Sequence, residues 1–132
     1  IIILLLNFLL LNCSEDQTDA QSNTGWKGSS NEFNQQFQKT IEPDSTTILL
    51  DSKTKEKFEG LLETNDSSLM SKKNYESGKL NGESSLTSIN GSRVDANFKN
   101  GKLHGKMILR DSEGNIRSVI TYDEGKISPA TE

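Results

Sequence analysis

The sequence has little of what most enzymes and disulfide-bonded proteins depend on. Its 132 residues include one cysteine, Cys13, and one histidine, His104, and only 6% are aromatic. A lone cysteine has no disulfide partner within the chain, and neither residue has the spacing of a metal site. We therefore expect no catalytic residue, no metal site and no cofactor. Because only 31% of the residues are hydrophobic, the core must be thin, which favours a single sheet over two packed layers.

Long apolar runs are also absent, except at the start of the sequence. The segment "IIILLLNFLLLN" at 1–12 carries no charge and precedes Cys13 directly. It is too short to span a bilayer as a helix, but it matches the apolar core of a secretory signal. A signal usually has Met and a basic stretch ahead of this core, so we expect further residues upstream.

The stretch "LLLNC" at 9–13 resembles the lipobox of bacterial lipoproteins. Leu10 fits that pattern, whereas Leu11 and Asn12 are larger than usual and are most similar to the relaxed lipobox of spirochaetes. The resemblance implies that residues 1–12 are removed as a signal peptide and that Cys13 carries a covalent lipid. It also implies a bilayer partner and a place in the bacterial envelope, at the outer membrane surface. A signal with a chance cysteine and a buried apolar segment are the alternatives.

Residues 13–28 are predicted to be a flexible tether, because "SEDQTDAQSNTG" offers no large apolar side chain to bury. Trp26, near its end, would rest either at the lipid headgroups or on the domain. The pattern then changes at 29–43, where Phe33, Phe37 and Ile41 recur at helical spacing. Ser29 and Glu32 are spaced as a capping box. We predict a short amphipathic helix over 29–43, followed by a β domain over 46–128.

A phrase repeats through the second half of the chain: "ESGKLNGE" at 76–83, "KNGKLHGK" at 99–106 and "DEGKIS" at 123–128. Asn-Gly between alternating residues is a strong signal for a two-residue hairpin turn, in which both positions take positive φ. We predict such turns at Ser77-Gly78, Asn100-Gly101 and Glu124-Gly125. Each turn would set an aromatic residue opposite an aliphatic one: Tyr75 and Leu80, Phe98 and Leu103, and Tyr122 and Ile127. The segment "KFEG" at 57–60 is a candidate for an earlier copy.

The alternation between these turns predicts an antiparallel sheet with one packed face and one wet face. In this register Asp95 would lie opposite Lys106. Gly82 and Gly105 fall on the packed face, where the missing side chain leaves room for an aromatic ring of a neighbouring copy. The outer loops "SINGS" and "DSEGN" would close the other ends, with the extra residue of the last repeat absorbed after Gly114.

The segment "NFKNGKLHGKMILRDSEGNIRSVITYDEGKI" at 97–127 resembles the bacterial variant of MORN repeats, as found in antitoxin-like proteins. The resemblance covers 74–128. It implies a mainly β fold, an antiparallel single-layer meander of MORN-like β-hairpins, used as a binding or structural scaffold without a catalytic residue.

Residues 67–117 carry nine basic and five acidic side chains, although the whole chain has a net charge of −4. A basic strand face would meet an anionic partner, either an unknown protein or a glycan. Nucleic acid is disfavoured by export and by the acidic total. The alternative is an ordinary solvated face. The candidate binding residues are Arg93, Lys99, Lys102, His104, Lys106 and Arg110.

Together these patterns favour a non-enzymatic surface lipoprotein that binds host or envelope molecules. The alternative is a periplasm-facing structural or immunity-type protein that binds a bacterial partner. A hydrolase would require a catalytic role for His104, for which the sequence offers no partner.

Overall fold

The computed structural model describes residues 25–129. The signal segment, Cys13 and the tether up to residue 24 lie outside the described residues. The expected mainly β fold is confirmed, with one short helix. In chain order the elements are β1 (Gly25–Gly28), α1 (Ser30–Gln36), β2 (Phe37–Ile41), β3 (Thr47–Asp51), β4 (Gly60–Asn65), β5 (Leu69–Glu76), β6 (Lys79–Ser88), β7 (Arg93–Lys99), β8 (Lys102–Leu103), β9 (Gly105–Arg110), β10 (Ile116–Asp123) and β11 (Lys126–Ile127).

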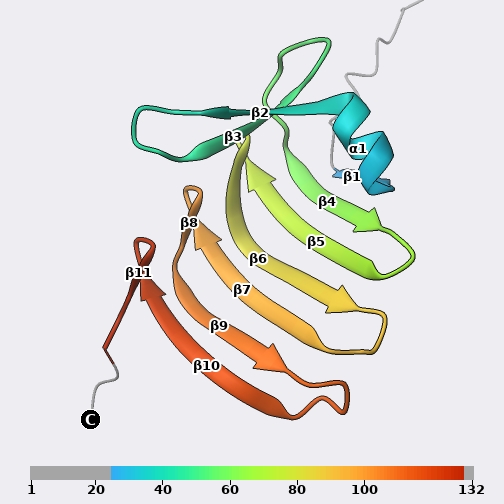
Figure 1. Cartoon of the computed structure of the whole chain (residues 1–132). Coiled ribbons are helices and arrows are strands. Elements are labelled where there is room, and N and C mark those ends of the chain that lie inside the picture. The colour runs from blue at the N-terminus through green and yellow to red at the C-terminus, as the bar shows by residue number, and fades with distance from the viewer. Residues whose placement is uncertain (1–24, 130–132) are drawn as a thin grey trace, which may run out of the picture.

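The main sheet runs in the order β1-β4-β5-β6-β7-β9-β10-β11, with β8 also paired to β7. From β4 onward all pairings are antiparallel and follow chain order, with β8 and β9 both paired to β7, so this part is the expected meander. Two features depart from that expectation. Strand β1 pairs with β4 in parallel, and β2 and β3 form a separate two-stranded sheet. Figure 1 shows α1 and the β2–β3 hairpin gathered at the end of the sheet that β1, β4 and β5 form. We call residues 29–52 the cap.

The predicted tether is wrong for its last four residues, because Gly25–Gly28 form strand β1. Trp26 explains why this segment is ordered. Its ring packs edge-on against Phe37, with centroids 5.5 Å apart, and its Nε1 donates to Gln36 Oε1 over 2.8 Å. Of the two placements considered for Trp26, the structure has the one on the domain.

The predicted helix is correct at its start and wrong in its second half. Ser29 and Glu32 form the full capping box. The helix ends at Gln36, however, and Phe37–Ile41 continue as β2, paired with β3. The apolar spacing was misleading because Ile41 is 74% exposed. Pairing with β3 holds Phe37 in the core. It also gives the backbone N–H and C=O groups hydrogen-bond partners, which the end of a short helix would lack.

The three predicted hairpin turns are confirmed. The first residues of the turns, Ser77, Asn100 and Glu124, have φ of 49°, 49° and 47°, and the glycines that follow have φ of 77°, 83° and 84°. The aromatic and aliphatic residues pair across the strands as expected: Tyr75 with Leu80, Phe98 with Leu103 and Tyr122 with Ile127.

The predicted pairing of Asp95 with Lys106 is wrong, since Asp95 lies opposite Ile108. The register is offset by two residues between β8 and β9, at His104 and Gly105. Gly105 takes φ +89° there, and Gly82 takes φ +87° at the equivalent position of β6. Bulges of this kind need a residue that tolerates positive φ. Because the offset is even, it moves the partners without turning the faces over.

Gly82 and Gly105 each lie opposite an aromatic residue of a neighbouring hairpin, as predicted. Gly82 pairs with Phe98 and Gly105 with Tyr122. In the same way Gly60 of β4, with φ +96°, pairs with Tyr75.

The outer loops also differ from the prediction in one respect. The loops at 88–92 and 111–115 are equivalent, each closed by a hydrogen bond from its first residue to its last. The extra residue therefore does not lengthen the loop after Gly114. Instead it forms a β-bulge at Arg117, between the paired residues Ile116 and Ser118.

The hydrophobic core lies between the cap and the first strands of the main sheet. Phe37, Leu49, Phe58 and Leu62 are buried there, at most 5% exposed. From Lys79 to Pro129 only Ala96 is buried, at 9% exposure. The later strands therefore form a single layer with both faces reachable by solvent.

Candidate functional site

Two of the predicted binding residues, Arg93 and Arg110, lie directly opposite one another on β7 and β9. They share one carboxylate, because Asp95 is 2.6 Å from Arg93 Nε and 3.6 Å from Arg110 Nε. This pairing neutralises part of the charge that the sequence assigned to a basic face.

The three predicted lysines lie nearer the hairpin turns. Lys99 and Lys102 pair across the Asn100-Gly101 turn, and Lys106 lies beyond the bulge, opposite Thr121 of β10. Among residues 25–129, none of the three forms an ion pair. The six predicted residues therefore divide into three places: the arginine pair, the lysines and His104.

His104 lies at the bulge between β8 and β9, next to the last hairpin. Its Nδ1 is 3.3 Å from Asp123 Oδ1. The same nitrogen is inaccessible to solvent and makes no hydrogen bond, so the contact is close in distance but is not a hydrogen bond. Glu124, at the turn, brings a second carboxylate, and ligand atoms of the three residues lie within 4.8 Å of one another. The sequence did not predict that Asp123 and Glu124 lie beside His104; the alignment of the hairpins only placed them at the positions that Lys99 and Asn100 hold in the preceding turn.

The hairpin turns are hydrogen-bonded to one another in series. The N–H of Gly78 donates to the carbonyl of Phe58 over 2.9 Å. Gly101 and Gly125 repeat the contact with Leu80 and Leu103, each over 2.8 Å. Each turn is thus fixed to the strand start of the preceding unit. The segment 57–60 occupies the same place relative to its neighbour as 79–82 and 102–105.

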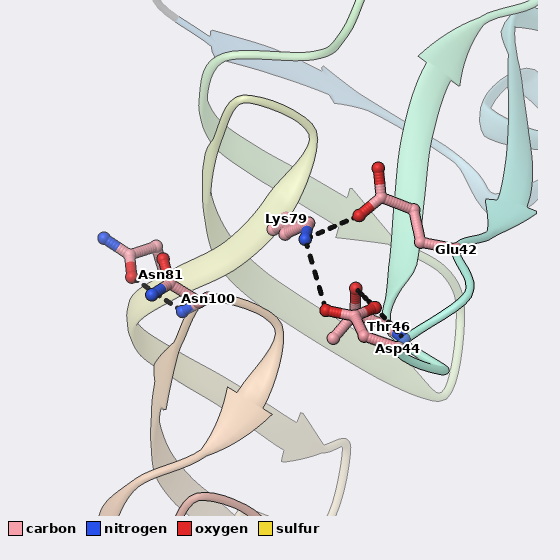
Figure 2. Close-up of polar contacts among 6 residues, drawn as sticks. All are labelled: Glu42, Asp44, Thr46, Lys79, Asn81 and Asn100. Atoms are coloured by element: carbon pink, nitrogen blue, oxygen red, sulfur yellow. Dashed lines mark hydrogen bonds and ion pairs between the residues drawn. The ribbon is translucent and has the colours of Figure 1, made fainter.

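The loop between β2 and β3 lies over the first two turns, as Figure 2 shows. Lys79 Nζ is 2.7 Å from Glu42 Oε2 and 3.7 Å from Asp44 Oδ2. The Thr46 hydroxyl and N–H donate to Asp44 over 2.5 and 2.9 Å, and these bonds hold the pKa of the Asp44 carboxyl below its usual range. Thr46 itself is 3% exposed and packs against Gly101. These contacts position the cap on the first two hairpins.

Asn81 links the first two hairpins beside this loop. Its Oδ1 accepts from the N–H of Asn100 over 3.1 Å, and its Nδ2 donates to Glu76 Oε2 over 2.5 Å (Figure 2 labels Asn81 and Asn100). Asn81 stands in the slot that His104 fills in the next unit. In this slot the Asn81 amide links two successive turns by hydrogen bonds, whereas the His104 imidazole makes no hydrogen bond through Nδ1.

A cavity of 280 Å³ lies between α1 and the main sheet. Its lining combines apolar side chains, such as Phe33 and Leu62, with Lys39, Lys73 and Tyr75. Burial and then the nearby Lys39 lower the pKa of Lys73, and burial raises the pKa of Tyr75 to about 12. The charged side chains in its lining are Lys39, Lys73 and Asp66.

A shallower groove of 260 Å³ lies at the outer-loop end of the sheet. Leu69, Leu86, Val94 and Leu109 form its floor. Leu69 and Leu86 are 41% and 39% exposed. The groove shows that the apolar side of the meander is left open beyond the cap.

Among residues 25–129, no helix combines the length and the apolar character that crossing a bilayer requires. Comparison of the chain with protein-family models, with curated proteins and with solved structures finds no significant match.

Proposed function

We propose that this protein is a non-catalytic lipoprotein of a bacterial envelope, which presents a sheet of MORN-like hairpins for binding host or envelope molecules. The observation that carries the proposal is the open layer. Beyond Lys79 each strand pairs with at least one neighbour, yet Ala96 is the one buried residue up to Pro129. A rigid sheet with reachable faces suits recognition, whereas catalysis usually needs a concave site that excludes water.

The anchor is proposed from the sequence. An apolar segment of twelve residues precedes the sole cysteine, Cys13. One acyl chain holds a protein at a membrane only marginally, whereas two or three chains hold it stably. A diacylglyceryl group and an N-terminal acyl chain on Cys13 would keep the sheet at the bilayer.

The repeat assignment is supported by the recurrence of one unit. Three turns share the same φ pattern, and each donates a hydrogen bond to the unit before it. In repeat proteins each unit contacts its neighbours and buries its surface on them. An anionic partner is supported by Lys99, Lys102 and Lys106, which have no ion pair within residues 25–129.

Labelling with radioactive palmitate tests the anchor. Because Cys13 is the only cysteine, any thioether-linked label reports on it. We expect the wild-type chain to be labelled and to sediment with membranes, and Cys13→Ala to be unlabelled and soluble. Ser14→Ala is the matched control and should behave as wild type. An unlabelled wild-type chain would refute the anchor.

Protease treatment of intact cells then tests which side of the membrane the sheet faces. Loss of the protein supports the surface assignment. Protection, with digestion only after lysis, would replace it with the periplasm-facing alternative.

Retention on immobilised heparin, a sulphated glycan, tests the charged surface. The full chain with Lys99, Lys102 and Lys106 changed to Glu should elute at lower salt than wild type. The control carries the same three changes at Lys53, Lys55 and Lys57, which are exposed on the β3–β4 connection. Equal elution of the two variants would discard the proposed binding residues.

A further inference from the structure

The contact between His104 and Asp123 is unusual in its chemistry. Two electronegative atoms, an imidazole nitrogen and a carboxylate oxygen, lie 3.3 Å apart. No hydrogen bond joins them, and the nitrogen is inaccessible to solvent. The His104 and Asp123 side chains are themselves 40% and 72% exposed. Lone pairs on the two atoms repel one another, and either a proton on Nδ1 or a metal ion between the two atoms removes that repulsion.

The distance fits a metal ion. Ligand atoms that each lie about 2.0–2.1 Å from a tetrahedral zinc are separated by roughly 3.3 Å. Glu124 supplies a third donor, since ligand atoms of all three residues lie within 4.8 Å of one another. One imidazole and two carboxylates form a ligand set that Zn²⁺ accepts, with water completing the coordination.

The set of ligands is specific to the last hairpin. In the previous unit the slot of His104 is filled by Asn81, and the positions of Asp123 and Glu124 are filled by Lys99 and Asn100. Asn81 there makes an ordinary hydrogen bond to the Asn100 N–H. The last hairpin has three potential metal ligands where the previous one has the Asn81 hydrogen bond. Glu124 has a φ of 47°, a conformation that asparagine adopts more readily than glutamate.

We propose that His104, Asp123 and Glu124 form a binding site for a divalent transition metal of the zinc type. The metal would join the bulge of β8 and β9 to the turn between β10 and β11, and so fix the last hairpin to the unit before it. This site does not depend on the lipid anchor.

The repeats themselves provide matched variants. His104→Asn introduces the residue that the previous unit has at this position, Asn81. The double variant Asp123→Lys, Glu124→Asn introduces the residues found at Lys99 and Asn100. Because the preceding hairpin folds with these residues, both variants should keep an unfolding midpoint near that of the wild type in the absence of metal.

The experiment is a titration of the purified full chain with Zn²⁺, followed by NMR. Since His104 is the only histidine, the imidazole signals report on one residue. We expect a saturable change at one zinc per chain and a rise in the unfolding temperature with zinc. Apparent affinity should fall at least tenfold in the Asp123→Lys, Glu124→Asn variant. The thermal stabilisation should be lost in His104→Asn.

Three outcomes would overturn the proposal. The first is an imidazole that responds to pH but not to zinc up to about 1 mM, because a proton then fills the gap. The second is an equal response to Ca²⁺, because the carboxylates alone would then bind. The third is stabilisation of His104→Asn equal to that of wild type. Cys13→Ala, run in parallel, should retain the zinc response, which separates this result from any failure of the lipid anchor.

Discussion

The part of the chain before Lys79 and the part after it are built from similar hairpins but are stabilised differently. Before Lys79 the cap covers the sheet, and the buried side chains are Phe37, Thr46, Ile48, Leu49, Phe58, Leu62 and Ser71. After it, up to Pro129, Ala96 is the one buried residue. We call these the capped half and the open half.

The aromatic contacts follow the same division. A chain of ring contacts runs from Trp26 through Phe37 and Phe58 to Tyr75, with centroids 5.2–5.6 Å apart. Among the described residues of the open half, no such pair of rings occurs. The open half is held by its strand ladders and by the hydrogen bonds that fix each turn to the previous unit. The comparison shows that the hairpins beyond Lys79 have the same turn geometry as the first hairpin although Ala96 is their one buried residue.

Truncating a leucine in each half should separate the two most strongly. Leu62→Ala leaves a cavity under the cap and should lower the free energy of unfolding by about 3 kcal/mol. Leu109→Ala, the same change on the half-buried face of β9, should cost about 1 kcal/mol. Urea denaturation of both variants measures the difference. Equal losses would mean that the open half has a covered core in solution.

Two glycines with the same backbone conformation test the packing of the cap on the turns. Gly78 and Gly114 have φ of 77° and 87°. A Cβ at Gly78 would lie 2.6 Å from Ile48 Cγ2 and 2.9 Å from the Leu49 carbonyl oxygen, whereas nothing lies within 4 Å at Gly114. Gly78→Ala should therefore destabilise by about 2–4 kcal/mol.

For Gly114→Ala only the backbone strain remains, about 1 kcal/mol. Thermal unfolding of the two variants gives the comparison. A Gly114→Ala loss as large as that of Gly78→Ala would contradict the role of the cap.

The phenol of Tyr75 predicts a loss of stability at high pH. Burial raises its pKa from 10.0 to about 12 in the folded chain. The folded state therefore holds this proton more tightly than the unfolded state does, so the contribution is complete below pH 10 and is lost as the pH rises towards 12.

Unfolding midpoints between pH 9 and 11.5 measure that loss. Tyr75→Phe keeps the ring against Phe58 and should make the alkaline decline shallower than in wild type. Parallel declines in the two proteins would assign the pH dependence to other groups, such as the lysines.

The smallest effect concerns the turns themselves. Ser77 and Asn100 both have φ 49° as the first residue of their turns, and asparagine adopts this conformation more readily than serine. Ser77→Asn should stabilise by roughly 0.5 kcal/mol, and Asn100→Ser should destabilise by a similar amount. Chemical denaturation of both variants and of the double exchange tests this symmetry. A gain from both single changes would show that side-chain contacts, not backbone preference, decide these positions.

Local chemistry in the sequence was sufficient for several features of the fold. Asn100-Gly101 and its two equivalents required positive φ, so the turns and the pairs across them followed. The capping box at Ser29 set the start of the helix. Alternation of apolar and polar residues kept Val94 and Leu109 on one face even where the register was offset by two, because an even offset preserves the faces.

Other features depended on partners far away in the chain. Phe37 became a strand residue because pairing with β3 placed its ring in the core, which outweighed a helical spacing worth little in so short a segment. Trp26 is ordered because its ring packs against Phe37 in the same aromatic cluster. The bulge at Gly105 moved Lys106 away from Asp95 and brought Arg110 opposite Arg93, so Asp95 partly neutralises both arginines of the predicted basic face.

The sequence alone determined that this protein is a chain of hairpins, because turn geometry and alternation are local properties of the backbone. Tertiary structure alone decided which hairpins have a core and which side chains meet. It did so because burial under the cap, and the approach of His104 to Asp123 and Glu124, depend on how successive units stack.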